Sequence, residues 1–310
     1  MVATSRGFIY IAPIEIMVDT AVTDKTFVYR FGQKECDLSA RTHIMGVLNV
    51  TPDSFFDGGK YVTVDKAVER ALEMVAEGAD IIDVGGESTR PKSHAYGEGA
   101  EPVTMEEELR RVTLVIEKLA DKTDIPISID TYKAAVAEKA LGCGAVIVND
   151  ISGFTFDLEM PSVVAEAGAS AVLMHIKGTP KTMQLDPTYD DLLGEVSEFL
   201  QNGLERGRHM GINQMMVDPG IGFGKRQDHN LRLIKELSTF KSLGYPILVG
   251  PSRKSFIGNI LNLLVEERIE GSIAACVACI LYGANILRVH DVKEAKRAAL
   301  VADAIKRAAA

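Results

Sequence analysis

The stretch IPISIDTYKAAVAEKALGCGAVIVND, residues 125–150, contains two short apolar runs on either side of an amphipathic segment. The runs 125–130 and 145–150 are rich in Ile and Val and do not alternate with polar residues. Such runs indicate strands that are covered on both faces. Between them, apolar residues recur at helical spacing, and the segment ends in Gly144, as helices often do. A strand, a helix and a second strand in this order predict neighbouring strands of a parallel sheet.

The same alternation continues in both directions along the chain. Further apolar runs cover 43–50, 79–86, 170–175, 214–220, 245–250 and 285–290, and helical periodicity covers 64–79, 104–120, 191–211 and 291–308. Eight strands alternating with helices favour the α/β class and a (β/α)8 TIM barrel. An open, doubly wound sheet is the alternative, but the Gly-x-Gly-x-x-Gly sequence of its nucleotide-binding form is absent after the first strand.

The glycine-rich segment DPGIGFGK, residues 218–225, follows the sixth predicted strand. Its glycines suit a tight turn or a backbone that lies close to a ligand. Arg226 follows Lys225 where a Walker phosphate-binding loop has Ser or Thr, and the glycine spacing also differs. The segment is therefore not predicted to bind a nucleotide.

The residues before the first barrel strand form a separate unit. Residues 25–39 consist of two short β-like runs around a Gly-containing turn, which predicts a hairpin that covers the bottom of the barrel. We expect an N-terminal extension over residues 1–26 and one barrel domain over residues 27–310. The apolar run 7–17 is too short to cross a membrane and includes Glu15, so no membrane association is expected.

Composition narrows the possible partners and the compartment. The chain has 310 residues, 46% of them hydrophobic, and a formal net charge of -9, which disfavours binding to nucleic acid. Its four cysteines do not form the dense framework of a small secreted domain, and a reducing cytoplasm fits them best. Cys276 and Cys279 form a Cys-x-x-Cys within an apolar helical stretch, where core packing is the expected role.

Polar residues end nearly every predicted strand. They are Asn49, Asp83 with Glu87, Asp130, Asn149 with Asp150, His175, Asp218, Lys254 just beyond the seventh strand, and Arg288 with His290. The active site of such a barrel lies at the C-terminal ends of its strands. Asp130, Asn149 and Asp218 are then expected to meet at one mouth, where they suit a ligand with a row of N–H donors, such as a guanidine-like edge of a heterocycle. Helix capping is the alternative role for any one of them.

Positive charge is predicted at the same mouth. Lys254, Arg288 and His290 would supply it, and Ser252 and Ser255 lie near a predicted helix start that favours an anion. A structural ion pair with one of the acids is the alternative role for Arg288. Asn49 offers an oxygen to a Mg2+ ion whose shell is completed by phosphate and water.

Two long loops flank this mouth. They follow the first and second strands, at 51–61 and 85–102, and both contain Gly and Pro. Such loops often act as lids, and Phe55 and Phe56 would then be sheltered against an aromatic substrate. The alternative is that one phenylalanine packs permanently on the barrel rim. His94, in the second loop, is expected to be solvated.

Eight motifs in register resemble the dihydropteroate synthase family over residues 27–307. They are MGVLNVTPDSFFDGG, GGESTRP, PISIDTYK, VNDISG, MHIKGTPKTMQ, DPGIGFGK, GPSRKSFIG and RVHDV. The resemblance implies that 7,8-dihydropterin-6-ylmethyl diphosphate reacts with 4-aminobenzoate, with Mg2+ assisting, and that a cytoplasmic homodimer forms through the C-terminal helices. It also implies inhibition by sulfonamides. Phe56 departs from the commonest form of the motif, in which a small polar residue often stands there.

The resemblance assigns roles to individual residues. Pterin diphosphate would be bound by Asn49, Thr89, Asp130, Asn149, Asp218, Lys254, Arg288 and His290, with Asn49 also binding the metal. The aminobenzoate pocket would consist of Phe55, Thr89, Arg90, Pro91, Phe223 and Ser255. Asp53, Asp57, Lys254 and Arg288 would be catalytic. A pterin-dependent methyltransferase barrel and a non-catalytic pterin-binding paralogue are the alternatives, although a methyltransferase needs neither the two loops nor the diphosphate-binding Arg288 and His290.

Overall fold

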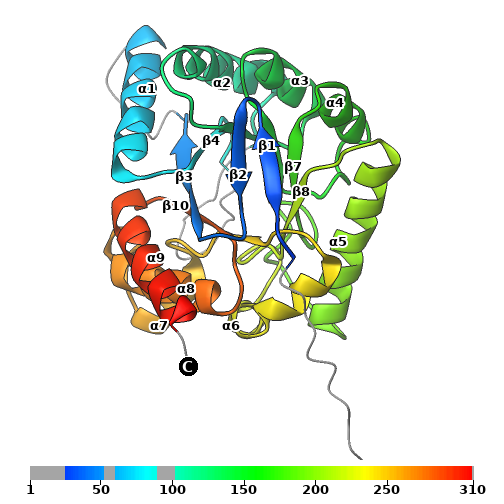
Figure 1. The fold of residues 1–310 in the computed structure, drawn as a ribbon. Helices are drawn as coiled ribbons and strands as arrows, with labels where there is room; N and C mark the ends of the chain where they lie inside the picture. The colour runs from blue at the N-terminus through cyan, green and yellow to red at the C-terminus, as the bar shows by residue number, and fades with distance from the viewer. Residues whose placement is uncertain (1–24, 52–59, 89–101, 309–310) are drawn as a thin grey trace, which may run out of the picture.

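Eight parallel strands form a barrel in the computed structural model, which describes residues 25–51, 60–88 and 102–308. The strands are β3 (His43–Asn49), β4 (Ile81–Gly85), β5 (Ile127–Asp130), β6 (Ile147–Asp150), β7 (Ser170–Met174), β8 (Met215–Asp218), β9 (Leu248–Val249) and β10 (Ile286–Val289). Each lies within one of the apolar runs, so the predicted α/β class and the (β/α)8 barrel are confirmed (Figure 1).

The sheet order β8-β7-β6-β5-β4-β3-β10-β9 leaves β8 and β9 at its two ends. A parallel bridge between Val217 and Ile247 joins these ends, and the amide of Val217 donates to the carbonyl of Pro246 at 3.0 Å. β9 is shorter than the predicted run 245–250 because Pro246 and Pro251 on either side cannot donate a ladder hydrogen bond.

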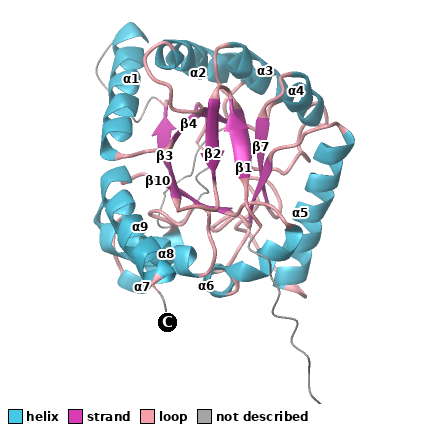
Figure 2. Cartoon of the chain, in the orientation of Figure 1, coloured by secondary structure: helices cyan, strands magenta, loops and turns pink. Residues whose placement is uncertain are grey.

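Helices surround the strands on the outside of the barrel (Figure 2). They are α1 (Lys60–Glu77), α2 (Met105–Ala120), α3 (Ala134–Gly142), α4 (Met160–Glu166), α5 (Leu192–His209), α6 (Gln227–Lys235), α7 (Ser255–Leu261), α8 (Ile269–Leu281) and α9 (Val292–Arg307). The five helical periodicities predicted α1, α2, α3, α5 and α9. The described residues also contain 3-10 segments at Leu237–Leu243 and Val265–Glu267.

An antiparallel hairpin closes the barrel at the N-terminal ends of its strands. It consists of β1 (Val28–Phe31) and β2 (Lys34–Asp37), and Figure 1 shows it in front of the strands. Tyr29 and Phe31 share a buried cluster with residues near the strand starts, among them Ile81 and Ile147. The Tyr29 hydroxyl also donates to the carbonyl of Met215 at 2.7 Å. The predicted hairpin at the barrel bottom is therefore confirmed, whereas the domain boundary at residue 26 stays a prediction.

A larger hydrophobic core lies between the outward faces of the strands and the helices. Cys276 and Cys279 of α8 belong to it and are free thiols with exposures of 1% and 0%, as the core-packing prediction requires. Across the described ranges, no helix is both long and apolar enough to span a membrane.

Candidate active site

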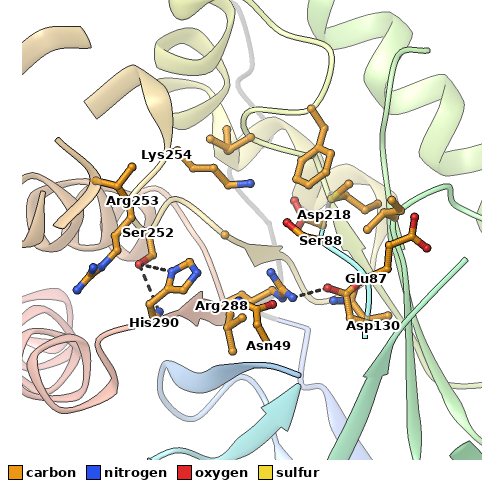
Figure 3. A pocket seen from close by; sticks show the side chains of 18 residues that line it. Asn49, Glu87, Ser88, Asp130, Asp218, Ser252, Arg253, Lys254, Arg288 and His290 are labelled. Atoms are coloured by element: carbon orange, nitrogen blue, oxygen red, sulfur yellow. Dashed lines mark hydrogen bonds and ion pairs between the residues drawn. The ribbon is translucent and has the colours of Figure 1, made fainter. Parts of the chain in front are cut away.

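A polar cavity of about 260 Å³ opens at the C-terminal ends of the barrel strands. Figure 3 shows its side chains converging from strand ends and from the loops that follow them. Its polar lining consists of Asn49, Glu87, Ser88, Asp130, Asn149, Asp218, Ser252, Arg253, Lys254, Arg288 and His290. Its other lining residues are Val47, Ile151, Met174, Ile221, Phe223, Gly250 and Val265.

Strand register explains why these side chains meet. Asn49, Gly85, Asp130 and Asn149 are successive partners across β3, β4, β5 and β6. Partnered residues in parallel strands point to the same face of the sheet, so this row lies at one level of the barrel. Gly85 contributes no side chain, and a Cβ there would lie 3.6 Å from Asp130 Oδ2 and 3.8 Å from Asn49 Oδ1.

Arg288 pairs with two carboxylates beneath the cavity. Its Nε donates to Asp83 Oδ2 at 2.6 Å, and its Nη2 donates to Asp130 Oδ2 at 2.5 Å. Asn149 Nδ2 donates to the same oxygen of Asp83 at 3.1 Å. Burial opposes the guanidinium charge, but Asp83 and Asp130 keep the pKa of Arg288 above its ordinary value. Arg288 therefore forms the structural ion pair foreseen as its alternative role, and it also lines the cavity (Figure 3).

The two cavity carboxyls have raised pKa values. Burial raises the pKa of Asp130 to about 7, although Arg288 favours the charged form. Burial also raises the pKa of Asp218 to about 6, opposed by the Gly220 amide, which donates to Asp218 Oδ1 at 2.7 Å. A buried carboxyl with a pKa near neutrality exchanges a proton easily and gains from a ligand that donates hydrogen bonds.

Lys254 and Phe223 form the wall facing these acids. The Lys254 ammonium lies 4.2 Å from the centre of the Phe223 ring, a cation–π distance. Burial and the nearby Arg288 lower the pKa of Lys254 to about 8. Ser255 begins α7 directly after Lys254, but it is not among the residues that line the cavity.

His290 and Ser252 lie together in another part of the cavity lining. The His290 ring lies 3.1 Å from Ser252 Oγ through Nδ1, and the His290 amide donates to the same hydroxyl at 3.3 Å. Burial and Arg288 lower the pKa of His290 to about 4, so the imidazole is neutral near pH 7. Arg253 is held by Asp291 through two hydrogen bonds of 2.9 and 2.5 Å.

Three other polar residues at strand ends have internal partners. Asp150 accepts hydrogen bonds from Ser152 and from the Phe154 amide, which is the capping role foreseen as an alternative. His175 faces the buried Lys225 and does not line the cavity, contrary to its predicted place at the mouth. Glu87 lines the cavity, but Tyr132 and Lys133 already bind its carboxylate.

The cavity brings together most of the predicted site residues that the structure describes. The predicted residues that line it are Asn49, Asp130, Asn149, Asp218, Phe223, Lys254, Arg288 and His290. The roles of eight others stay predictions because these residues lie outside the described ranges: Asp53, Phe55, Phe56, Asp57, Thr89, Arg90, Pro91 and His94. Apart from Phe223, the sequence reasoning missed the apolar lining residues. Val47 could have been found, because it lies two positions before Asn49 on the same strand and therefore on the same face.

The fold and the cavity define an enzyme class: a TIM barrel that binds a flat, hydrogen-bonding ligand carrying an anionic group at the mouth of its strands. The family profile described as pterin binding enzyme matches residues 45–290. A dihydropteroate synthase from Synechocystis is 48% identical over 279 residues, covering 89% of this chain and 94% of that protein.

Solved structures agree with this comparison. A dihydropteroate synthase of Yersinia pestis in complex with a sulfonamide drug is 42% identical, with a TM-score of 0.84 over 91% of this chain and 100% of that one. Another, from Xanthomonas albilineans in complex with 7,8-dihydropteroate, is 37% identical, with a TM-score of 0.79 over 90% of this chain and 98% of that one. The chain belongs to the dihydropteroate synthase family of pterin-binding enzymes.

Proposed function

We propose that this enzyme condenses 7,8-dihydropterin-6-ylmethyl diphosphate with 4-aminobenzoate, giving 7,8-dihydropteroate and pyrophosphate. The observation that carries the proposal is one cavity whose lining combines hydrogen-bond acceptors with cationic groups. Asp130, Asn149 and Asp218 provide the acceptors, and Lys254 and Arg288 provide the charge. This arrangement matches a substrate with a donor-rich ring at one end and a diphosphate at the other.

The pterin ring would be bound by its N–H edge. Asp218 has Oδ1 fixed by the Gly220 amide, which leaves its second oxygen to accept from the ring. Asn149 has its amide nitrogen committed to Asp83, and its amide oxygen remains as an acceptor. Each donor of the substrate then meets an acceptor that is already oriented, so little ordering is required on binding.

The diphosphate would lie toward Arg288, His290 and Ser252. Mg2+ fits this end, because Asn49 lines the cavity and carries an amide oxygen. The same residues contain no cluster of three or more His, Cys, Asp or Glu side chains for a metal. Mg2+ is commonly held by one or two protein oxygens together with substrate phosphates, and such an ion would offset charge on the leaving diphosphate.

The bond change is a displacement at the methylene carbon. The carbon–oxygen bond to the diphosphate breaks, the aminobenzoate nitrogen forms a bond to that carbon, and the amine loses a proton. Carboxylates near the carbon would stabilise positive charge that develops there as the diphosphate departs. Phe223 and Lys254, with Ser255 at the start of α7, would hold the aminobenzoate. We expect Phe55, Thr89, Arg90 and Pro91 to complete its pocket, with Asp53 and Asp57 near the reacting atoms.

Pyrophosphate release tests the reaction directly. The protein is incubated with both substrates and Mg2+, and pyrophosphate and dihydropteroate are measured together. We expect equal amounts of the two products, and none when aminobenzoate is omitted. Methyl transfer from methyltetrahydrofolate would instead indicate the methyltransferase alternative, and pterin binding without turnover would indicate a non-catalytic paralogue.

Sulfonamides provide a second test of the aminobenzoate pocket. We expect a sulfonamide to inhibit competitively with aminobenzoate, because the two molecules share an aniline ring that carries an anionic or polar group. Inhibition that excess aminobenzoate does not relieve would contradict the assignment of Phe223 and Ser255 to this pocket.

We also infer a cytoplasmic homodimer. The free thiols of Cys36, Cys143, Cys276 and Cys279 support a reducing compartment. Exposed apolar side chains on the C-terminal helices support association between copies. They include Leu281 of α8, Tyr282 directly after it, and Val301 and Ile305 of α9, each at least 44% exposed.

A further inference from the structure

Lys225 ends the glycine-rich loop that supplies both Asp218 and Phe223 to the cavity, yet the proposed reaction gives it no role. Its side chain is buried, with an exposure of 2%, and it does not line the cavity. A buried lysine is costly unless its nitrogen has partners. Its contacts therefore indicate why the loop ends in this residue.

Two acceptors satisfy the Lys225 amine. Its Nζ donates to the carbonyl of Phe223 at 2.9 Å and lies 2.8 Å from His175 Nδ1. His175 is 4% exposed and packs edge-on against Phe199, with ring centres 4.8 Å apart. Burial lowers the pKa of both Lys225 and His175, which favours the uncharged form of each.

Gly220 lies against the same pair at the other end of the loop. A Cβ there would collide with the carbonyl oxygen of His175 and lie 3.3 Å from Lys225 Nζ. The Gly220 amide is the donor that fixes Asp218 Oδ1. The Lys225 amine therefore lies close to the loop at Gly220 as well as at Phe223.

Two neighbouring loop carbonyls have side-chain donors of their own. Gln184 donates to the carbonyl of Gly222, and Tyr189 donates to that of Gly224, each at 2.7 Å. The Phe223 carbonyl has Lys225 as its side-chain donor. The Phe223 ring lies 4.2 Å from the Lys254 ammonium. The hydrogen bond from Lys225 restrains the backbone of Phe223 and therefore bears on the position of this ring.

We propose that Lys225, anchored by His175, is a positioning residue for the aminobenzoate substrate: it fixes the Phe223 ring beside Lys254 without touching either substrate. This inference rests on the proposed function. It predicts that loss of the amine changes aminobenzoate recognition more than pterin recognition, because Asp218 keeps its bond to the Gly220 amide.

The principal variant is Lys225→Met, which keeps the length of the side chain and removes its donors. It leaves the Phe223 carbonyl and His175 Nδ1 without a partner, so the loop relaxes. We expect KM for aminobenzoate to rise roughly tenfold or more. The dissociation constant of the pterin diphosphate, measured by calorimetry without aminobenzoate, should change by less than about threefold.

Two further variants separate positioning from a general loss of folding. Lys225→Gln can still donate to the Phe223 carbonyl and should recover part of the KM. His175→Phe keeps a ring against Phe199 and removes the acceptor, so its effect should not add to that of Lys225→Met, as expected for two residues that act as a unit. Lys118→Met is the matched control, because Lys118 of α2 bonds Asp65 at the protein surface, away from this loop, and KM should not change.

The outcomes are distinguishable. A wild-type enzyme without turnover overturns the proposed function itself. An active wild type, combined with folded Lys225 variants whose aminobenzoate KM stays within about twofold, overturns the positioning role. Equal weakening of pterin and aminobenzoate binding also overturns it, because the loop would then act on the whole cavity.

Discussion

At the scale of single residues, the site depends on how each buried carboxyl is partnered. Asp83 is fully buried, and its Oδ2 accepts from both Arg288 and Asn149. Asp218 is 4% exposed and has one internal donor, the Gly220 amide. The charge of Asp83 is paired with Arg288, although Asp83 Oδ1 has no hydrogen-bond partner among the described residues, whereas the carboxylate of Asp218 is left for a ligand. Replacement of each by Asn should therefore change stability in opposite directions.

Asp218→Asn should stabilise the unliganded enzyme at pH 8 and weaken pterin binding. The folded-state pKa of Asp218, about 6, lies above its ordinary value, so the folded protein binds the proton more tightly. The wild-type enzyme therefore loses stability as pH rises from about 4 to 6. The side-chain amide of the Asp218→Asn variant does not ionise and avoids this loss, which is worth about 1–3 kcal/mol. Urea unfolding at pH 4 and pH 8 measures the free energy of unfolding of the variant and of the wild type. A difference between the two proteins that is equal at both pH values would contradict the explanation.

Asp83→Asn should destabilise the enzyme by about 1–3 kcal/mol, because Arg288 loses a buried counter-charge while Asp130 remains. The same urea experiment at pH 8 measures this loss. Asp218→Asn is the matched control, since it replaces a buried Asp by Asn at the same cavity with the opposite expected sign. An unchanged or increased free energy of unfolding would show that Arg288 does not require Asp83.

At the scale of elements, the two ends of the barrel have separate tasks. The β1–β2 hairpin packs Tyr29 and Phe31 against the strand starts, whereas the cavity opens at the strand ends. Such a division is common in TIM barrels, where one face carries stability and the other carries the reaction. A change in the hairpin should therefore affect folding and leave substrate recognition unaltered.

Phe31→Ala tests this division. Phe31 is 2% exposed, and its truncation leaves a cavity that should cost about 3–5 kcal/mol. We expect a lower free energy of unfolding in urea and unchanged KM values for both substrates at a temperature where the variant stays folded. A marked change in either KM would show that the hairpin is coupled to the C-terminal mouth.

At the scale of the whole molecule, the apolar surface of the C-terminal helices is the feature that folding alone does not explain. Val301 and Ile305 lie one helical turn apart on α9, with exposures of 62% and 61%. The chain carries a net charge of -9, so two copies must bury enough apolar area to offset their repulsion. We expect the interface between the two copies to form on the exposed faces of these helices.

Val301→Glu with Ile305→Glu should prevent formation of the proposed dimer, because its interface would then bury four added carboxylates. Sedimentation velocity across a range of protein concentrations measures the change. Leu158→Glu is the control, since Leu158 is 79% exposed and lies between β6 and α4. Dissociation by the control alone would place the interface elsewhere.

Much of the site could be anticipated because it depends on where strands end. Asp130, Asn149 and Asp218 were found by that rule, and all three line the cavity. The rule failed for His175, which the structure turns toward Lys225, and it could not show which acids Arg288 pairs with. Helices α4 and α6 were also not predicted: α4 has only seven residues, too few for a clear period, and α6, QDHNLRLIK, is mostly polar.

The sequence by itself determined the alternation of strands and helices, the barrel class and the family motifs, because periodicity and turn chemistry act over a few neighbouring residues. Tertiary structure alone decided which polar groups neutralise one another. Asp83 and Arg288 stand 205 positions apart, yet their atoms meet at 2.6 Å. Only barrel closure and strand register set that distance, and with it the groups that remain open to a ligand.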